Sequence, residues 1–238
     1  MKKIIPLIAP ILFLTFGFFL IGQALPKSLM DQWEDVESEI KKGLPKTAIE
    51  KIDPLIKQAL KDGSHAVAIR AIGQKINLEG AIQGNKAEEK IARLEDEITK
   101  APEALKPMMR AVLSNWYWQY FQQNRWRFAQ RTRTTEAPGE DITTWDLPRI
   151  LAEIDKQFQK TLSYHEVLKK EAIGDYDFLL KKGNVPESYR PTLYDFVVHD
   201  ALRFYSAGEQ AGSKAQDSFV LSADSPIFAS AKDFMGWE

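Results

Sequence analysis

The residues best suited to chemistry by type and spacing form a dense stretch of aromatic rings and arginines. Its rings are Trp116, Tyr117, Trp118, Tyr120, Phe121, Trp126 and Phe128, and its arginines are Arg125, Arg127, Arg131 and Arg133. Rings stack on bases and sugars, and guanidinium groups stack on rings, so such a stretch can bind nucleic acid or glycan. The same side chains also fill a helix interface, with arginine stems packed along the ring edges. The net charge of −1 favours this structural interpretation, because nucleic-acid binding needs a basic surface.

The histidines do not form a catalytic or metal-binding pattern. His65, His165 and His199 are far apart in the sequence and lie at no metal-ligand spacing. His199 precedes Asp200, as a base might precede its orienting carboxylate, but adjacent residues on a helix point in different directions. The chain also lacks a Gly-x-Ser-x-Gly turn, a phosphate-binding loop and a metalloprotease helix motif. We therefore predict no enzymatic activity, no metal site and no cofactor.

The segment Tyr189-Arg190-Pro191-Thr192-Leu193-Tyr194-Asp195-Phe196 has an unusual density of large, directional side chains. Pro191 suits the start of a helix, and Tyr194 and Phe196 are expected to pack inward. Arg190 can bond a carboxylate or the carbonyl groups at a helix end. We interpret the segment as the beginning of a helix rather than as a ligand site.

The composition excludes several other classes of site. The chain has no cysteine, which excludes disulfides, thiolate metal sites and a cysteine nucleophile. It also excludes the lipid-anchored cysteine of a bacterial lipoprotein. Lysine and arginine total 32 against 33 aspartates and glutamates, so we expect no nucleic-acid partner.

The first 24 residues have the pattern of a secretory signal segment. Residues 1–3 are Met-Lys-Lys, residues 4–21 are uncharged and almost wholly apolar, and residues 22–24 are Gly-Gln-Ala. This pattern predicts export to the periplasm or cell envelope, with cleavage between Ala24 and Leu25. A retained anchor is the alternative, because about 18 apolar residues are just enough to span a bilayer. Without a lipid-anchored cysteine, an uncleaved leader is the only membrane tether that we expect.

Helical periodicity runs through most of the remaining chain. Apolar residues recur every three or four positions from Leu29, and we expect helices over about 29–42, 47–62, 64–79, 86–99, 108–121, 147–171, 176–180 and 192–205. Thr47, with Glu50 three residues later, is expected to cap the second helix, and Pro54 to kink that helix or delay its start. Asp146 is expected to cap the long helix that carries Pro148 in its first turn.

Short helices separated by Gly and Pro turns predict an all-α fold of antiparallel helical hairpins in a repeat-like array. The interval 131–146 lacks apolar periodicity, so we interpret it as a linker between a helical-hairpin region, 25–130, and a second helical region, 147–206. Residues 207–238 are expected to form an irregular tail. Because apolar residues continue to the last positions of this tail, we expect the chain to be truncated.

Four strings carry a resemblance to a known family. They are Trp33-x-x-Val36 with Lys42-Gly43-Leu44-Pro45-Lys46-Thr47-Ala48, then Tyr120-Phe121-Gln122-Gln123-Asn124-Arg125-Trp126, then Asp141-Ile142-Thr143-Thr144-Trp145-Asp146-Leu147, and the segment 189–196. In this order they resemble the helical N-terminal region of large bacterial alpha-2-macroglobulin-like proteins, from about Trp33 to Phe228. The last two strings are the most specific, because they combine rare residues in a fixed order. The residues that carry the resemblance are expected to be structural: Trp33, Asn124, Arg125, Trp126, Trp145, Asp146, Tyr189, Arg190, Pro191, Tyr194, Asp195 and Phe196.

The resemblance implies inhibition of endopeptidases outside the cytoplasm. In this family a bait region is cut, the molecule rearranges and the protease is trapped, in many members through an internal thioester. The β-sandwich macroglobulin domains of full-length members follow such a helical region, whereas this chain has neither a cysteine for a thioester nor a run of alternating strands.

We therefore expect a fragment that is the non-trapping, N-terminal part of such an inhibitor and acts as a scaffold or interaction module. Its expected partners are the downstream macroglobulin domains of a longer parent and, through that parent, proteases. A free-standing periplasmic helical-repeat module that binds protein is the alternative. A third hypothesis is a glycan-binding or hydrolytic module that uses the stretch of aromatic rings and arginines.

Overall fold

The computed structural model describes residues 27–131, 139, 141–181, 183, 184, 186–207, 230 and 232. Its α-helices are α1 (Lys27–Lys41), α2 (Pro45–Lys61), α3 (His65–Ile82), α4 (Ala87–Lys100), α5 (Lys106–Gln123), α6 (Arg125–Gln130), α7 (Leu147–Leu162), α8 (His165–Leu168) and α9 (Leu193–Tyr205). Short 3-10 turns lie at Ile142–Thr144 (η1), Ile173–Tyr176 (η2) and Glu187–Tyr189 (η3). Within these residues no strand forms, and Ala172 and Thr192 make one isolated antiparallel bridge. The predicted all-α class is confirmed for the described part of the chain.

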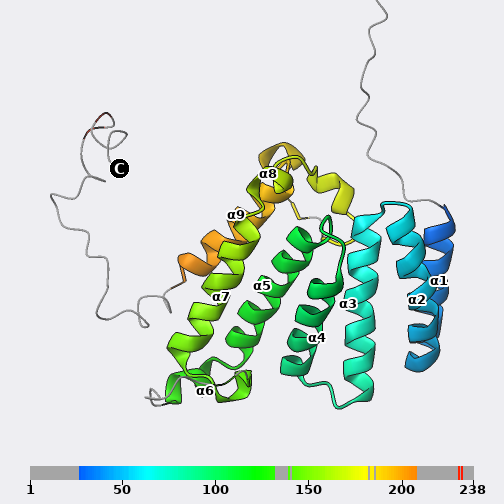
Figure 1. Ribbon diagram of the computed structural model, residues 1–238, viewed down its shortest axis with the longest axis horizontal. Coiled ribbons are helices and arrows are strands. Elements are labelled where there is room, and N and C mark those ends of the chain that lie inside the picture. Colours follow the sequence, from blue (N-terminus) through cyan, green and yellow to red (C-terminus); the bar gives the residue numbers. More distant parts are fainter. Residues whose placement is uncertain are drawn as a thin grey trace, which may run out of the picture.

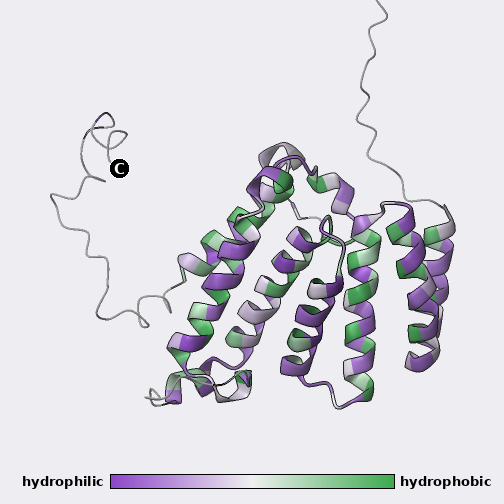
Figure 2. Ribbon diagram, in the orientation of Figure 1, coloured by the Kyte–Doolittle hydropathy of each residue, from purple (hydrophilic) through white to green (hydrophobic). Residues whose placement is uncertain are grey.

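The helices lie side by side in nearly the order of the sequence (Figure 1). α1 packs on α2, α2 on α3, α3 on α4 and α4 on α5, and α5 then packs on α7. α9 closes this end of the row against both α5 and α7. Hydrophobic and hydrophilic residues alternate along most of the helices (Figure 2), and neighbouring helices bury one another's apolar faces.

The expected start of the second helix is wrong by two residues. α2 begins at Pro45, its N-cap is Leu44, and no side chain caps it. Proline fits the first helical position because its φ is already helical and its missing N–H would be unpaired there. Thr47 therefore lies inside the helix rather than at its cap. α2 also continues through Pro54 to Lys61.

Two glycines near the end of α3 have different roles. Gly84 has a φ of +104° and follows the helix, as a residue in the turn should. Gly80 lies inside α3, where a Cβ would stand 2.6 Å from Cε of Lys90 on α4. Gly80 thus provides room for the Lys90 side chain, whose Nζ donates a hydrogen bond to Asn85 Oδ1 at 2.5 Å.

The long helix expected over 147–171 ends earlier, at Leu162. Asp146 caps it as predicted, since its carboxylate accepts a hydrogen bond from the Arg149 N–H at 3.0 Å. Near the other end, the Ser163 hydroxyl donates to the Lys160 carbonyl at 2.7 Å. Such a local bond competes with continuation of the helix, and the chain turns before α8.

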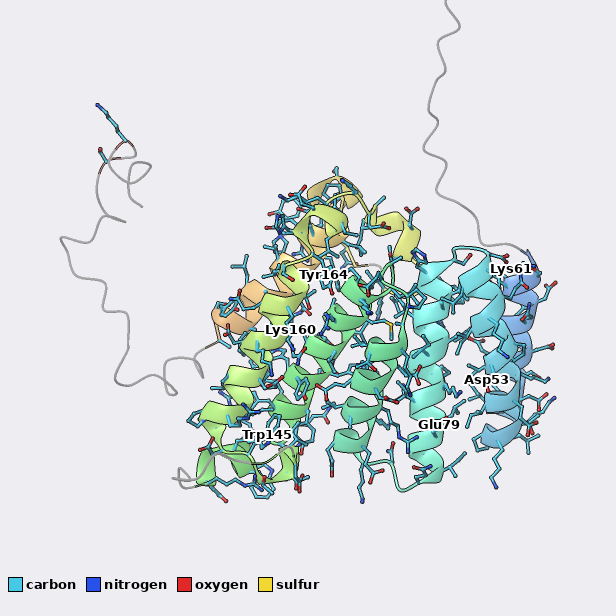
Figure 3. All side chains as sticks on the ribbon, viewed as in Figure 1. Asp53, Lys61, Glu79, Trp145, Lys160 and Tyr164 are labelled. Carbon is cyan, nitrogen blue, oxygen red and sulfur yellow. The ribbon has the colours of Figure 1, made fainter. Side chains whose placement is uncertain are left out.

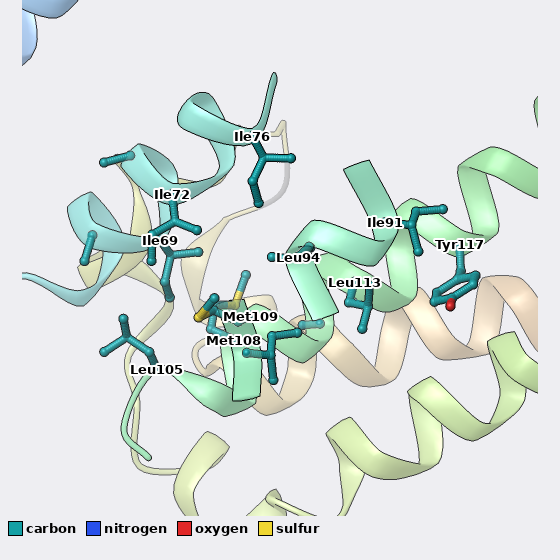
Figure 4. Close-up of a cluster of buried hydrophobic side chains, with 14 of the residues drawn as sticks. Ile69, Ile72, Ile76, Ile91, Leu94, Leu105, Met108, Met109, Leu113 and Tyr117 are labelled. Carbon is teal, nitrogen blue, oxygen red and sulfur yellow. The ribbon is translucent and has the colours of Figure 1, made fainter. Parts of the chain in front are cut away.

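The buried hydrophobic residues form one continuous cluster from Leu29 in α1 to Phe204 in α9. Its middle lies between α3, α4 and α5, which contribute Ile72, Leu94 and Met109 respectively (Figure 4). The predicted linker contributes as well, because Ile142 and Trp145 are buried. α5 packs directly against α7, so the helices on the two sides of that interval share this core.

The leader, with Ala24 and Leu25, lies outside the described residues, as does most of the expected tail over 207–238. None of the described helices has the length and apolar character needed to cross a bilayer.

Candidate binding groove

The stretch of aromatic rings and arginines packs mostly inside the protein. Four of its rings are buried, and Phe128 contacts both Tyr120 and Phe121 at centroid distances of 6.0 and 5.8 Å. Two of its arginines bond backbone carbonyl groups, Arg127 that of Thr143 at 3.3 Å and Arg131 that of Trp145 at 2.7 Å. Arg133 lies outside the described residues. These contacts agree with the structural interpretation of the stretch.

The residues Asn124, Arg125 and Trp126 mark the turn from α5 to α6. Asn124 ends α5, and its Nδ2 donates to the Tyr120 carbonyl at 2.9 Å. Arg125 is exposed, and so is Trp126, with 64% of its surface accessible.

Trp145 and Asp146 fix the start of α7. The Trp145 indole donates to the Gly139 carbonyl at 2.7 Å and stacks parallel to the buried Tyr117 at 6.3 Å. The Arg149 guanidinium lies 4.8 Å from the centre of the same indole. With the Asp146 cap, these contacts hold the beginning of α7 against α5.

Trp33 belongs to a cluster that the sequence did not reveal. The Arg70 guanidinium carbon lies 4.5 Å from the Trp33 ring and 4.3 Å from the Phe178 ring, and Arg70 Nη1 donates to the Phe178 carbonyl at 2.8 Å. The Trp33 indole donates to Glu37 at 2.8 Å. Burial lowers the pKa of Arg70, although nearby Glu37 opposes this effect. The cluster attaches the segment after η2 to α1 and α3.

The segment 189–196 forms the start of α9, as predicted. Thr192 is the N-cap, and Asp195 completes a reciprocal capping box by accepting from the Thr192 N–H at 3.0 Å. Pro191 precedes the cap, Arg190 is half-buried, and Tyr194 and Phe196 are partly buried against the core. Tyr189 is exposed, and its ring lies 6.5 Å from that of His199.

His199 and Asp200 point to different partners. The Asp200 carboxylate accepts from the Asn115 side chain at 3.1 Å, whereas the His199 ring faces Tyr189. Among the described residues, no three His, Cys, Asp or Glu side chains group as metal ligands.

A buried polar junction joins α4, α5 and α7. The Tyr117 hydroxyl donates to Glu95 at 3.0 Å, and the buried Glu153 accepts from Lys156 at 3.0 Å and Gln157 at 2.7 Å. Burial raises the pKa of Glu95, the Tyr117 bond partly offsets this rise, and the negative charge of Glu153 adds to it. The pKa of Tyr117 is also raised, chiefly by burial and then by Glu95. These polar groups bond one another where the helices pack. We therefore interpret the junction as part of the helix packing and not as a binding site.

A groove of about 550 Å³ lies between α2, α3 and α4. Asp53 on α2 and Glu79 on α3 mark one part of it (Figure 3). Its lining combines apolar and charged side chains: Ile56, Leu60, Ile72, Ile76, Ala101, Pro102 and Leu105, with Asp53, Lys57, Lys75, Glu79, Arg93, Asp96, Glu97 and Lys100. We call this space the α2–α4 groove.

Ion pairs connect the charged side chains of the α2–α4 groove. Lys75 pairs with Asp53 at 2.6 Å, and Arg93 pairs with Glu79 at 2.7 Å. Lys100 also pairs with Asp96, next to the apolar Ala101. Charged side chains of both signs and apolar side chains therefore line the groove together.

Carboxylates dominate the surroundings of Lys75 in the α2–α4 groove. The hydrogen bond to Asp53 raises the pKa of Lys75 against the opposing effect of burial, and the charges of Asp53, Glu79 and Glu97 raise it further. Glu97 on α4 and Lys57 on α2 form no ion pair with the residues that the structure describes. They lie on opposite walls of the α2–α4 groove and are available to a ligand.

No protein-family model, curated protein or solved structure matches this chain. The sequence alone does not predict the α2–α4 groove, because the charged residues of the groove have the periodicity of ordinary solvated helix faces.

Proposed function

We propose that this chain is a helical scaffold that binds polypeptide and forms the non-trapping, N-terminal part of an extracytoplasmic alpha-2-macroglobulin-like endopeptidase inhibitor. The observation that carries the binding role is the α2–α4 groove, in which apolar and charged side chains of three helices line one open space. Helical scaffolds use such extended surfaces to hold segments of other proteins. The packing of each helix from α1 to α5 on the next supports the repeat-like, antiparallel arrangement of hairpins that we propose for this region.

The proposal that this chain is part of an inhibitor rests on the four sequence strings that carry the family resemblance. Their residues are used mainly for helix caps and packing, as with Trp33 beside Arg70, Asp146 at α7, and Asp195 in the capping box of α9. Such a framework suits a region that positions other domains, while the trapping chemistry belongs to the longer parent. The leader-like pattern over residues 1–24 supports an address in the periplasm or cell envelope.

The reading frame beyond codon 238 tests the proposed parent. We expect an open frame that continues into strand-rich, repeated domains. An in-frame stop codon at that position would contradict the inhibitor and leave a free-standing periplasmic module that binds protein.

A protease assay tests the non-trapping role. The 238-residue chain, mixed with an equimolar endopeptidase, should leave cleavage of a large protein substrate unchanged, whereas the longer parent should slow it. Stoichiometric inhibition by the 238-residue chain alone would refute the assignment of trapping to other domains.

A further inference from the structure

We propose that a second depression, between α3, α4 and α5, binds one pyranose ring of an uncharged sugar. We call it the α3–α5 pocket, and its volume is about 270 Å³. Two aromatic rings, three primary amides and one lysine stem carry the argument: Trp116, Tyr120, Asn77, Gln119, Gln123 and Lys90. The pocket has no lining residue in common with the α2–α4 groove, so this inference does not rest on the proposed polypeptide-binding role.

Trp116 offers the pocket an aromatic surface that the protein itself does not use for stacking. The other rings of α5 each pack on a further ring, as Tyr117, Trp118, Tyr120 and Phe121 do. Trp116 is only partly buried, and within the described part of the chain it makes no ring pair or cation–π contact. An indole has an apolar face and an N–H donor at its edge, which matches the C–H face and hydroxyl edge of a pyranose.

The amides provide hydrogen bonds of the kind that sugar hydroxyls need. A primary amide carries donors and an acceptor side by side, so it can pair with two neighbouring hydroxyl groups. The exposed amides of Asn77 and Gln123 form no hydrogen bond with the residues that the structure describes. Gln119 Nε2 donates to Asn115 Oδ1 at 2.6 Å, and Asn115 donates to Asp200 at 3.1 Å. This chain of bonds holds Gln119 and leaves its carbonyl oxygen to accept from a ligand.

The charge of the pocket favours an uncharged ligand. Lys90 is the one charged side chain among the described residues of the lining. Its Nζ donates to Asn85 Oδ1 at 2.5 Å, and its stem passes so close to Gly80 that an added Cβ there would stand 2.6 Å from Cε. The ammonium therefore already has an acceptor, whereas a phosphate or carboxylate ligand is best bound by a cation that is free to pair with it.

The size of the pocket favours a single ring. Its volume of about 270 Å³ lies just below the range of about 300–1,000 Å³ that is typical of pockets for drug-sized ligands. A neutral space of this size, with an aromatic surface and several amides, suits one pyranose better than a length of polypeptide.

Saturation-transfer difference NMR on the full chain tests this inference. The probes are glucose, galactose, mannose and N-acetylglucosamine, each as the reducing sugar and as its methyl pyranoside. We expect saturation transfer to at least one of them, strongest at the C–H protons of one ring face. Trp116→Ala should weaken this binding by roughly tenfold, because the stacking surface is lost. Trp126→Ala is the control, since Trp126 is strongly exposed and lies outside the lining, and it should leave binding unchanged.

A second pair of variants separates binding from folding. Gln119 and Gln122 are both exposed on α5, but only Gln119 lines the pocket. Gln119→Ala should weaken sugar binding by roughly three- to tenfold through the lost hydrogen bonds, and Gln122→Ala should not. Far-ultraviolet circular dichroism should show the same helix content for both variants and the natural chain.

The two forms of each sugar distinguish the source of the ligand. Equal binding of methyl pyranosides and reducing sugars would assign the pocket to the end of a glycan chain, and binding of reducing sugars alone to free monosaccharides; either supports the inference. No saturation transfer to any of the probes, or transfer that persists in both Trp116→Ala and Gln119→Ala, would overturn it. Neither result would bear on the α2–α4 groove, whose residues are different.

Discussion

Arg70 connects three segments that are far apart in the sequence. Its guanidinium packs on both the Trp33 and Phe178 rings, which also contact each other edge to face, and it bonds the Phe178 carbonyl. We expect Arg70→Ala to lower the free energy of unfolding by about 2 kcal/mol, because stacking and a backbone hydrogen bond are lost together. Arg70→Lys should recover only part of this, since an ammonium lacks the planar faces of a guanidinium.

Urea denaturation measures this difference, and Arg203→Ala is the control. Arg203 is strongly exposed and pairs with Asp200 at 3.7 Å, so its removal should cost no more than about 0.5 kcal/mol. Equal effects of the two alanine substitutions would show that the Arg70 cluster does not stabilise the fold.

Glu95 should make stability depend on pH in the direction opposite to most carboxylates. Burial raises its pKa in the folded protein, so as the pH rises above the usual glutamate range, the unfolded chain loses the proton before the folded chain does. Stability is then lost as the pH rises through the folded pKa. Tyr117, Glu153, Lys156 and Lys160 all act on this carboxyl group.

Glu95→Gln removes this titration while keeping an acceptor for the Tyr117 hydroxyl. Unfolding in urea between pH 4 and pH 8 should show the variant gaining stability relative to the natural chain as the pH rises, by no more than about 1 kcal/mol for a half-buried group. A difference that stays constant with pH would contradict the role of Glu95.

Two helices, α9 and α3, have a hydroxyl residue at the N-cap, and only one of these residues bonds the helix backbone. Thr192 accepts a hydrogen bond from the Asp195 N–H at the start of α9, whereas Ser64 caps α3 without any side-chain bond. Thr192→Ala should therefore lower the free energy of unfolding by about 1 kcal/mol, and Ser64→Ala by much less. Thermal unfolding distinguishes them, and equal losses would contradict the capping box.

The sequence predicts elements where a local signal suffices. The sequence correctly predicts Asp146 as the cap of α7, because the residues that determine a cap are its neighbours. The prediction that Thr47 caps α2 is wrong, because Pro45 begins this helix two residues earlier. The Arg70 cluster and the α2–α4 groove were missed, since each joins residues from several helices whose spacing carries no local signal. Asp53, Lys75 and Arg93 look solvated in sequence and meet only when α2, α3 and α4 pack.

At the scale of the whole molecule, the continuous core predicts that the described helices unfold together. Phe158 of α7 is buried and stacks on Phe204 of α9 at 5.5 Å. Phe158→Ala should lower the free energy of unfolding by about 3–5 kcal/mol and move the whole transition monitored by circular dichroism. Leu202→Ala, at an exposed position on α9, should leave it nearly unchanged. Two separate transitions in the variant would show that the helices on either side of 131–146 unfold independently.

The central claim, that the α2–α4 groove binds polypeptide, can be tested directly because the chain has no cysteine. An environment-sensitive fluorophore is attached through Lys57→Cys on the groove wall and, in a second protein, through Ala152→Cys on the exposed side of α7. Both proteins are titrated with a pool of short synthetic peptides that carry both apolar and charged residues. We predict a saturable emission shift at the groove position and none at α7. No shift at either position, or equal shifts at both, would contradict the claim.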